Sequence, residues 1–219
     1  MTAAEVVSRL SRLDSCAVSD ALDKLALPGA VTGISRFSTD RRIAGRVLTV
    51  KLDRAAGRPA STRHLCTAAI EAAESGDIIV IEQRTGVDAA SWGGNLSIGA
   101  KQRGLAGVVI DGPARDIDES RQLEFPVFAR SITARTARGR ILEVSTNEPI
   151  TVGDVTVTPG DYVIADGSAV VFTAVAQIAR VLEIAESIVA REKAMAEALL
   201  SGQPISQVMG ATYEHMLKK

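Results

Sequence analysis

Apolar and polar residues recur along this chain with helical and strand-like periods that change from segment to segment. Two helices are expected within about residues 1–30, the second capped by Asp14 or Ser15. Residues 43–53 alternate between apolar and polar side chains, which predicts a strand. A long helix is expected from about 174 to 200, because apolar residues recur there every three or four positions.

Between these ends, helical and strand patterns follow one another in series. The three units are a helix over 61–75 before a strand over 77–81, a helix over 95–103 before a strand over 105–110, and a helix over about 116–123 before a strand over 126–129. Residues 141–173 instead predict short strands with hairpin turns, and a last short helix is expected after Pro204. Helix–strand units in series are typical of α/β architecture, and we expect one domain over residues 1–219.

Composition and charge argue against several classes of protein. A net charge of −1 provides no field that would attract a nucleic-acid backbone. The apolar runs are too short to span a bilayer, and the first residues lack a signal-peptide core, so we expect a cytoplasmic protein. Cys16 and Cys66 belong to no metal or redox motif, and we expect two buried free thiols.

The segment 91–96, Ser-Trp-Gly-Gly-Asn-Leu, contains two glycines directly before a predicted helix. Backbone N–H groups at a helix start have no partner within the helix, and the helix dipole favours a negative charge there. Without side chains at Gly93 and Gly94, an anion could approach these N–H groups closely. A plain capping turn explains the same two glycines, and both interpretations stay open.

A second candidate lies where the predicted strand 105–110 leads through Gly-Pro into the next helix, which carries Arg115 and Asp116. Loops beyond the carboxyl ends of such strands commonly bind ligands in α/β sheets. Arginine offers a planar donor fork for a carboxylate, and aspartate can bind Mg²⁺ through one oxygen. From the residues alone, an Arg–Asp pair that caps the helix is the simpler interpretation.

Other polar residues have simpler explanations. His64 lies in a predicted Ala-rich helix, where a packing or hydrogen-bonding role is more common than catalysis. Glu192 falls on the apolar stripe of the C-terminal helix, and it either projects into solvent or reaches a polar site, such as one on a neighbouring subunit. Three acids near the second candidate are expected to be caps or solvated: Asp111, Asp118 and Glu119.

Taken together, several segments resemble the family that includes 4-hydroxy-4-methyl-2-oxoglutarate aldolase and the regulator of ribonuclease activity A, the RraA-like family. These segments are GGNLSIGAKQRGLAGVVIDGPARDID (93–118), FPVFARSITARTARGRI (125–141), VGDVTVTPGDYVIADGSAVV (152–171) and SDALDKL (19–25). The resemblance covers most of the chain. It implies an αββα sandwich of the RraA-like type (swivelling β/β/α, phosphohistidine-domain-like), assembled as a trimer or hexamer with sites between subunits.

The resemblance also implies a class II aldolase that cleaves 4-hydroxy-2-oxo diacids to pyruvate and decarboxylates oxaloacetate. Asp116 matches the aspartate that holds Mg²⁺ or Mn²⁺, which stabilises an enolate as a Lewis acid. Arg115 matches the arginine that orients the 2-oxo acid and neutralises developing oxygen charge. The carboxylate of the substrate is expected at the helix start formed by Gly93, Gly94, Asn95 and Leu96.

The sequence departs from the family pattern at one position. Family aldolases commonly carry an acidic residue 21 positions before the arginine, and this chain has Gly94 there. We expect the metal site to be weaker, to use Asp88 or Glu192 instead, or to serve another 2-oxo acid. A lyase on another 2-oxo acid and a protein-binding regulator without catalysis are therefore alternatives to the aldolase.

Overall fold

The computed structural model describes residues 1–59 and 61–210. The helices are α1 (Ala3–Leu10), α2 (Ser15–Lys24), α3 (Thr67–Ala72), α4 (Gly94–Gln102), α5 (Ile117–Gln122), α6 (Ile178–Leu200) and α7 (Ile205–Val208). The strands are β1 (Ala30–Val31), β2 (Ser35–Arg36), β3 (Ile43–Arg54), β4 (Ile78–Glu82), β5 (Gly107–Ala114), β6 (Val127–Ile132), β7 (Ile141–Thr146), β8 (Ile150–Val152), β9 (Val155–Val157), β10 (Tyr162–Ala165) and β11 (Val170–Thr173).

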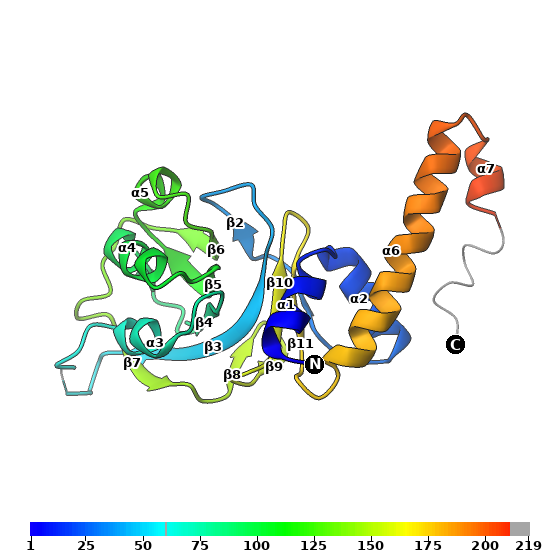
Figure 1. Cartoon of the computed structure of the whole chain (residues 1–219). Helices are drawn as coiled ribbons and strands as arrows, with labels where there is room; N and C mark the ends of the chain where they lie inside the picture. Colours follow the sequence, from blue (N-terminus) through cyan, green and yellow to red (C-terminus); the bar gives the residue numbers. More distant parts are fainter. Residues whose placement is uncertain (60, 211–219) are drawn as a thin grey trace.

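One long strand, β3, organises the main sheet. The strands follow the order β1-β11-β10-β3-β4-β5-β6-β2, and β7 also pairs with β3. One edge of β3 pairs with β10 over residues 43–46 and with β7 over 50–54, while the other edge pairs with β4. β3 to β6 run parallel to one another. Figure 1 shows β3 as a strongly curved ribbon that extends from the region of β7 to that of β10.

The middle of the sheet is covered on both faces. Along β4, Ile79 and Ile81 pack toward the helical layer of α3, α4 and α5, and Ile78 and Val80 pack toward the β8–β9 hairpin. This arrangement explains why the strand is continuously apolar rather than alternating. The result is a mixed α/β fold, as the sequence predicts, and its sheet is curled.

A third apolar cluster covers the end of the sheet formed by β10 and β11. There the N-terminal helices α1 and α2 pack with the first half of α6, through residues such as Val18, Leu22 and Leu182. The second half of α6 extends away from the sheet (Figure 1). The two predicted N-terminal helices, the long C-terminal helix and the short helix after Pro204 are all present.

The predicted helix over 61–75 is wrong in its first half, because α3 begins only at Thr67. Cys66 precedes α3 with a left-handed backbone (φ 65°), and its N–H donates to the side chain of Glu143 rather than to a helical carbonyl. A contact with a strand 77 residues further along the chain therefore overrides local helix propensity.

The predicted end of this strand at Ile110 is also wrong, because β5 continues to Ala114. The register with β6 shifts between Ile110 and Pro113, which accommodates a residue that has no N–H to donate. Gly112 is needed at this shift, since a Cβ there would lie 2.8 Å from the Cβ of Gln83. The strand therefore extends beyond Ile110 to Ala114, shortly before α5 begins at Ile117.

Both cysteines are free, as expected, but only Cys66 is buried. Cys16 is exposed, which corrects the expectation of two buried thiols. Among the helices that the structure describes, none combines the length and apolar character needed to cross a membrane.

Two buried carboxylates in the neighbouring parallel strands β4 and β5 hold the β8–β9 hairpin. Glu82 at the end of β4 accepts a hydrogen bond from the N–H of Thr151 (2.7 Å). Asp111 in β5 accepts one from the N–H of Gly153 (2.7 Å) and another from Nε of Arg130 (2.7 Å). The expectation that Asp111 is a cap or is solvated is therefore wrong.

We expect Asp111→Ala to lower the free energy of unfolding by about 2–4 kcal/mol, because it leaves Arg130 and the N–H of Gly153 without their acceptor. Urea denaturation measures this loss. The control is Asp118→Ala, which removes an 83% exposed side chain paired with Arg121 and should cost less than about 1 kcal/mol. Equal losses in the two variants would contradict the structural role of Asp111.

Candidate functional site

Backbone hydrogen bonds place the start of α4 beside the end of β5. The N–H of Ser91 donates to the carbonyl of Pro113 (2.9 Å), and the N–H of Arg115 donates to the carbonyl of Trp92 (3.0 Å). Residues 91–93 therefore run alongside the last residues of β5. This pairing brings the two candidate segments of the sequence together.

The carboxylate of Asp116 links these segments. Its Oδ2 accepts a hydrogen bond from the N–H of Gly94 (3.0 Å), and its Oδ1 accepts one from Nε of Arg115 (2.9 Å). Asp116 occupies the N-cap position of α5 in a left-handed conformation (φ 55°), yet its side chain makes no capping bond to that helix. The predicted Arg–Asp pair exists, and its carboxylate serves α4 instead of the helix that follows it.

This environment favours the ionised form of Asp116. Burial alone would raise the pKa of the carboxyl, but the hydrogen bond from the Gly94 N–H and the hydrogen bond and charge of Arg115 outweigh it and lower the pKa. Because the folded-state pKa lies below the unfolded one, these contacts stabilise the fold at neutral pH. That stabilisation is lost as the pH falls through the folded-state pKa.

Gly93 and Gly94 differ in which side chains can approach their backbone closely. A Cβ at residue 93 would lie 2.7 Å from Oδ2 of Asp116, so Gly93 allows the close approach of that carboxylate. A Cβ at Gly94 would lie 3.3 Å from Cβ of Glu119 and 3.4 Å from Cβ of Asp116. The stem of Glu119 thus borders the position where family aldolases commonly carry an acid.

A cavity of about 220 Å³ lies over Arg115, Asp116 and the start of α4. Its wall includes Ser91, whose buried hydroxyl is the one buried side-chain polar atom among residues 1–59 and 61–210 that has no hydrogen-bond partner. Within the same described residues, no group accepts a hydrogen bond from the N–H of Asn95 or from that of Leu96. Three donors among the residues that line the cavity therefore have no acceptor of their own within the described chain.

Buried groups behind the cavity hold α4 against α5. The indole N–H of Trp92 donates to the hydroxyl of Ser97 (2.9 Å), which lies 3.0 Å from the hydroxyl of Ser120. The ring of Trp92 also stacks on Phe125, with ring centroids 6.1 Å apart. These contacts fix the distance between the two helix starts that form the site.

The two tentative acids lie outside this cavity. Asp88 pairs with Arg135 (3.4 Å), with both side chains more than half exposed. Glu192 is on the exposed part of α6 and borders a different hollow, lined also by Asp14 and Asp166. Burial, followed by the charges of Asp14 and Asp20, raises the pKa of Glu192.

Sequence reasoning missed several residues of the cavity wall, among them His64 and Ser91. His64 borders the cavity rather than packing within a helix, and Ser91 contributes its unpartnered hydroxyl. The position of Ser91 beside the two glycines was a usable signal, whereas nothing local distinguishes His64. The other histidine, His215, to which the sequence assigned no role, lies outside the described residues.

The described part of the chain contains no group of three or more His, Cys, Asp or Glu side chains arranged to hold a metal ion. Asp116 is the acid that lines the 220 Å³ cavity. Each carboxylate oxygen has two acceptor sites, and each oxygen of Asp116 uses one of them within the protein. One free site on each oxygen remains for water or for a cation.

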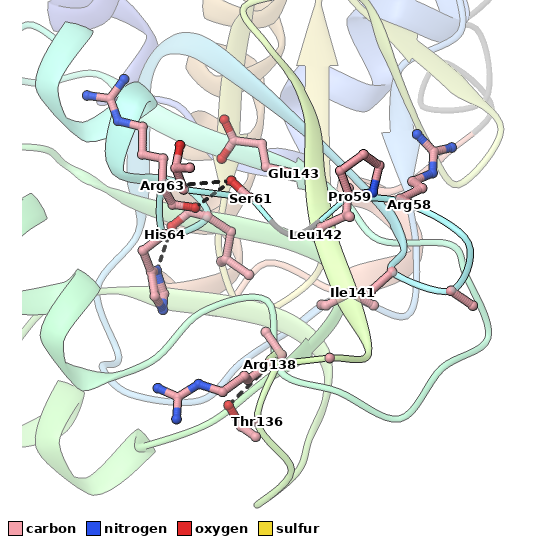
Figure 2. Close-up of a pocket in the computed structure, with 16 residues that line it drawn as sticks. Arg58, Pro59, Ser61, Arg63, His64, Thr136, Arg138, Ile141, Leu142 and Glu143 are labelled. Carbon is pink, nitrogen blue, oxygen red and sulfur yellow. Dashed lines mark hydrogen bonds between the residues drawn. The ribbon is translucent and has the colours of Figure 1, made fainter.

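A second, larger cavity of about 500 Å³ adjoins the first (Figure 2). It lies between the segment that precedes α3 and the segment 136–143, which leads into β7. Four residues line both cavities: His64, Leu65, Thr136 and Ala137. The two cavities are therefore neighbours across one shared wall.

Comparison with known proteins connects this site to a family. The model of the RraA-like family, described as Aldolase/RraA, matches residues 15–172. A Halalkalibacterium halodurans protein named "Putative 4-hydroxy-4-methyl-2-oxoglutarate aldolase" is 31% identical over 206 residues, with 91% of each chain covered. Protein DlpA of Legionella pneumophila is 26% identical over 94% of this chain, which spans about a third (33%) of its length.

A solved structure shows the same arrangement of elements over nearly the whole chain. An uncharacterized protein from Pseudomonas syringae pv. tomato superposes with a TM-score of 0.85 at 29% identity, covering 95% of this chain and 98% of the other. The fold inferred from the sequence pattern thus occurs in a protein of similar length.

We expect Arg115→Gln to raise the pKa of the Asp116 carboxyl, because the variant removes the charge and the Nε–H donor that favour its ionised form. Carbon-detected NMR titration of the aspartate carboxyl carbons measures the change. Arg121→Gln is the matched control, since Arg121 pairs with Asp118 and not with Asp116. An unchanged pKa in Arg115→Gln would contradict the described geometry.

Proposed function

The chain belongs to the RraA-like family, and from its site we propose that it is a divalent-metal-dependent carbon–carbon lyase. The proposed reaction cleaves 4-hydroxy-2-oxo diacids, such as 4-hydroxy-4-methyl-2-oxoglutarate, to pyruvate and a second carbonyl compound. The observation that carries this proposal is an ionised Asp116, held by Gly94 and Arg115 at the edge of a cavity with unpartnered donors. The named relative supports the same reaction class.

The residues fit a divalent cation held by one carboxylate. Asp116 is kept in its ionised form and has a free acceptor site on each oxygen. Mg²⁺ is commonly bound through one or two carboxylates, with water and substrate oxygens in the remaining positions. When bound there, Mg²⁺ or Mn²⁺ would supply Lewis-acid stabilisation of the negative charge that develops on the 2-oxo group.

The donors of the cavity suit the carboxylate of a 2-oxo acid. The N–H groups of Asn95 and Leu96 lie at the positive end of α4, in residues that line the cavity. Arg115 uses Nε to hold Asp116, which leaves its terminal nitrogens for a substrate oxygen. Arg115 thereby orients the substrate and offsets the charge that develops on the keto oxygen.

Oxaloacetate decarboxylation follows from the same arrangement. Loss of carbon dioxide and cleavage of an aldol both leave electrons on C3 and the keto oxygen of a 2-oxo acid. Stabilising that charge accelerates either reaction, so we propose both activities for one site. The glycine at residue 94 favours one variation, a lyase whose second carbonyl product differs from that of the named aldolase.

We also propose that the protein forms a homotrimer or hexamer, in which a neighbouring subunit covers the site. Arg115 and Asp116 border a further open hollow of about 580 Å³, and Ile132 in its wall is 57% exposed. An exposed apolar side chain beside a polar site suits a contact between subunits. Light scattering should give a mass three or six times the 23.0 kDa of the chain, and a monomer would contradict this proposal.

We expect Mg²⁺-supplemented protein to convert oxaloacetate to pyruvate, and we expect Asp116→Ala to reduce the rate at least 100-fold, because it removes the proposed metal ligand. A pyruvate assay measures turnover, and electron paramagnetic resonance of Mn²⁺ measures metal binding independently. Asp118→Ala is the matched control, since that acid is 83% exposed and pairs with Arg121.

Both Mn²⁺ binding and turnover should survive in Asp118→Ala and be lost in Asp116→Ala. Wild-type protein that binds Mn²⁺ but turns over neither oxaloacetate nor any 4-hydroxy-2-oxo diacid would contradict the lyase. Such a result would favour the alternative of a protein-binding regulator without catalysis.

A further inference from the structure

The two adjoining cavities differ in volume. The smaller one contains Arg115 and Asp116 and has a volume of about 220 Å³. Small-molecule sites usually occupy about 300–1,000 Å³, so this cavity is small for a six- or seven-carbon diacid. The larger cavity, of about 500 Å³, lies directly beyond the shared wall that includes His64 and Thr136.

Three arginines line the larger cavity. Arg58 and Arg63 line it, but each pairs with a carboxylate, of Asp53 and Glu71 respectively. Arg138 also lines it, and no carboxylate among the described residues lies within salt-bridge distance of its guanidinium. One cation therefore faces this space without a partner within the described chain.

Glu143 also lines the larger cavity, and it forms no salt bridge with Arg138. Glu143 accepts hydrogen bonds from the N–H of Cys66 and from the hydroxyl of Thr146. Its carboxylate thereby fixes the backbone just after His64 and Leu65. Arg138 therefore has no salt-bridge partner within the described chain that an anion would have to displace.

The hydrogen bond of His64 sets which ring nitrogen is free. Its Nδ1 lies 3.0 Å from the carbonyl oxygen of Leu65, and a carbonyl oxygen can only accept a hydrogen bond. Nδ1 therefore carries the proton in the neutral ring, which leaves Nε2 as an acceptor. Figure 2 shows the imidazole of His64 and the guanidinium of Arg138 extending toward the same side of the cavity.

We propose that the larger cavity holds the half of the substrate beyond C3, that Arg138 binds its distal carboxylate, and that Nε2 of His64 accepts the proton of the C4 hydroxyl. This inference rests on the proposed lyase function and names the residues that serve the leaving half. His64 is suited to this role because it borders both cavities, where C4 of a substrate anchored by its 2-oxo acid end would lie.

The step balances without any further reactant. Nε2 takes the hydroxyl proton, the C4–O bond becomes a carbonyl, and the C3–C4 bond breaks. Its electron pair moves to C3 and the keto oxygen, which gives the enolate of pyruvate. The imidazolium then supplies a proton to C3, which completes pyruvate and regenerates the neutral ring. Oxaloacetate has no hydroxyl proton to lose, so its decarboxylation does not need this base.

His64→Asn tests the base, because the asparagine amide nitrogen can replace Nδ1 in the bond to Leu65 while no group replaces Nε2. We expect kcat for cleavage of 4-hydroxy-4-methyl-2-oxoglutarate to fall about 100-fold or more, the usual contribution of a general base. Oxaloacetate decarboxylation by the same variant should fall by a much smaller factor, because that reaction has no hydroxyl proton to lose. Equal losses of both reactions, or no loss of cleavage, would overturn the role of His64.

Arg138→Gln tests the anion subsite by binding as well as by turnover. Loss of a charge-assisted hydrogen bond should weaken 2-oxoglutarate binding about tenfold or more in calorimetry of the Mg²⁺-loaded protein, and should leave the affinity for 2-oxobutyrate, which lacks the distal carboxylate, unchanged. Arg135→Gln is the matched control, since Arg135 pairs with Asp88 and does not line this cavity.

The same calorimetry separates the two proposals. Weakened binding of the diacid alone in Arg138→Gln supports the subsite even if the wild-type protein turns over no substrate, a result that would contradict only the lyase. Equal weakening of both ligands, or none, would overturn the subsite even in an active enzyme.

Discussion

The carboxylate of Asp116 is the contact on which the geometry of the site depends. It accepts hydrogen bonds from the N–H of Gly94 and from Arg115, and so it joins the start of one helix to the end of a strand. This is possible because Asp116 adopts a left-handed backbone that turns its side chain away from α5. Aspartate tolerates that conformation better than most residues with a Cβ.

The hydrogen bond from Gly94 to Asp116 also determines which N–H groups at the start of α4 are left without an acceptor. The first N–H of α4 is occupied by Asp116, whereas the next two, of Asn95 and Leu96, have no acceptor within the described chain. The site therefore combines the ion pair of Asp116 and Arg115 with neutral N–H donors. Such a site suits a ligand that carries both a carboxylate and a neutral keto oxygen, because each part meets a different type of group.

Much of the fold could be predicted from the sequence, because the signals were local. The continuously apolar run in β4 reflects burial on both faces, and the start of α4 lies within one residue of its predicted position. The pairing of Arg115 with Asp116 was also expected. Neighbouring residues and simple periodicity were sufficient in each of these cases.

The errors arose where a distant residue decides the local structure. The helix predicted over 61–75 is shortened by Glu143, whose side chain takes the N–H of Cys66. Asp111 is buried rather than solvated because Arg130 and Gly153 supply its hydrogen bonds. Since no local pattern encodes these contacts, the sequence could not place His64 in the wall of the site.

The length of β3 has a consequence for how the chain acquires its structure. One edge of β3 is completed by residues 141–146 and 162–165, more than 85 positions later in the chain. During synthesis, this twelve-residue strand must wait until those residues leave the ribosome, with its edge unpaired. Pairing over such sequence separations gives a high contact order and slow folding, so the newly made chain is most prone to aggregation before residue 165 emerges.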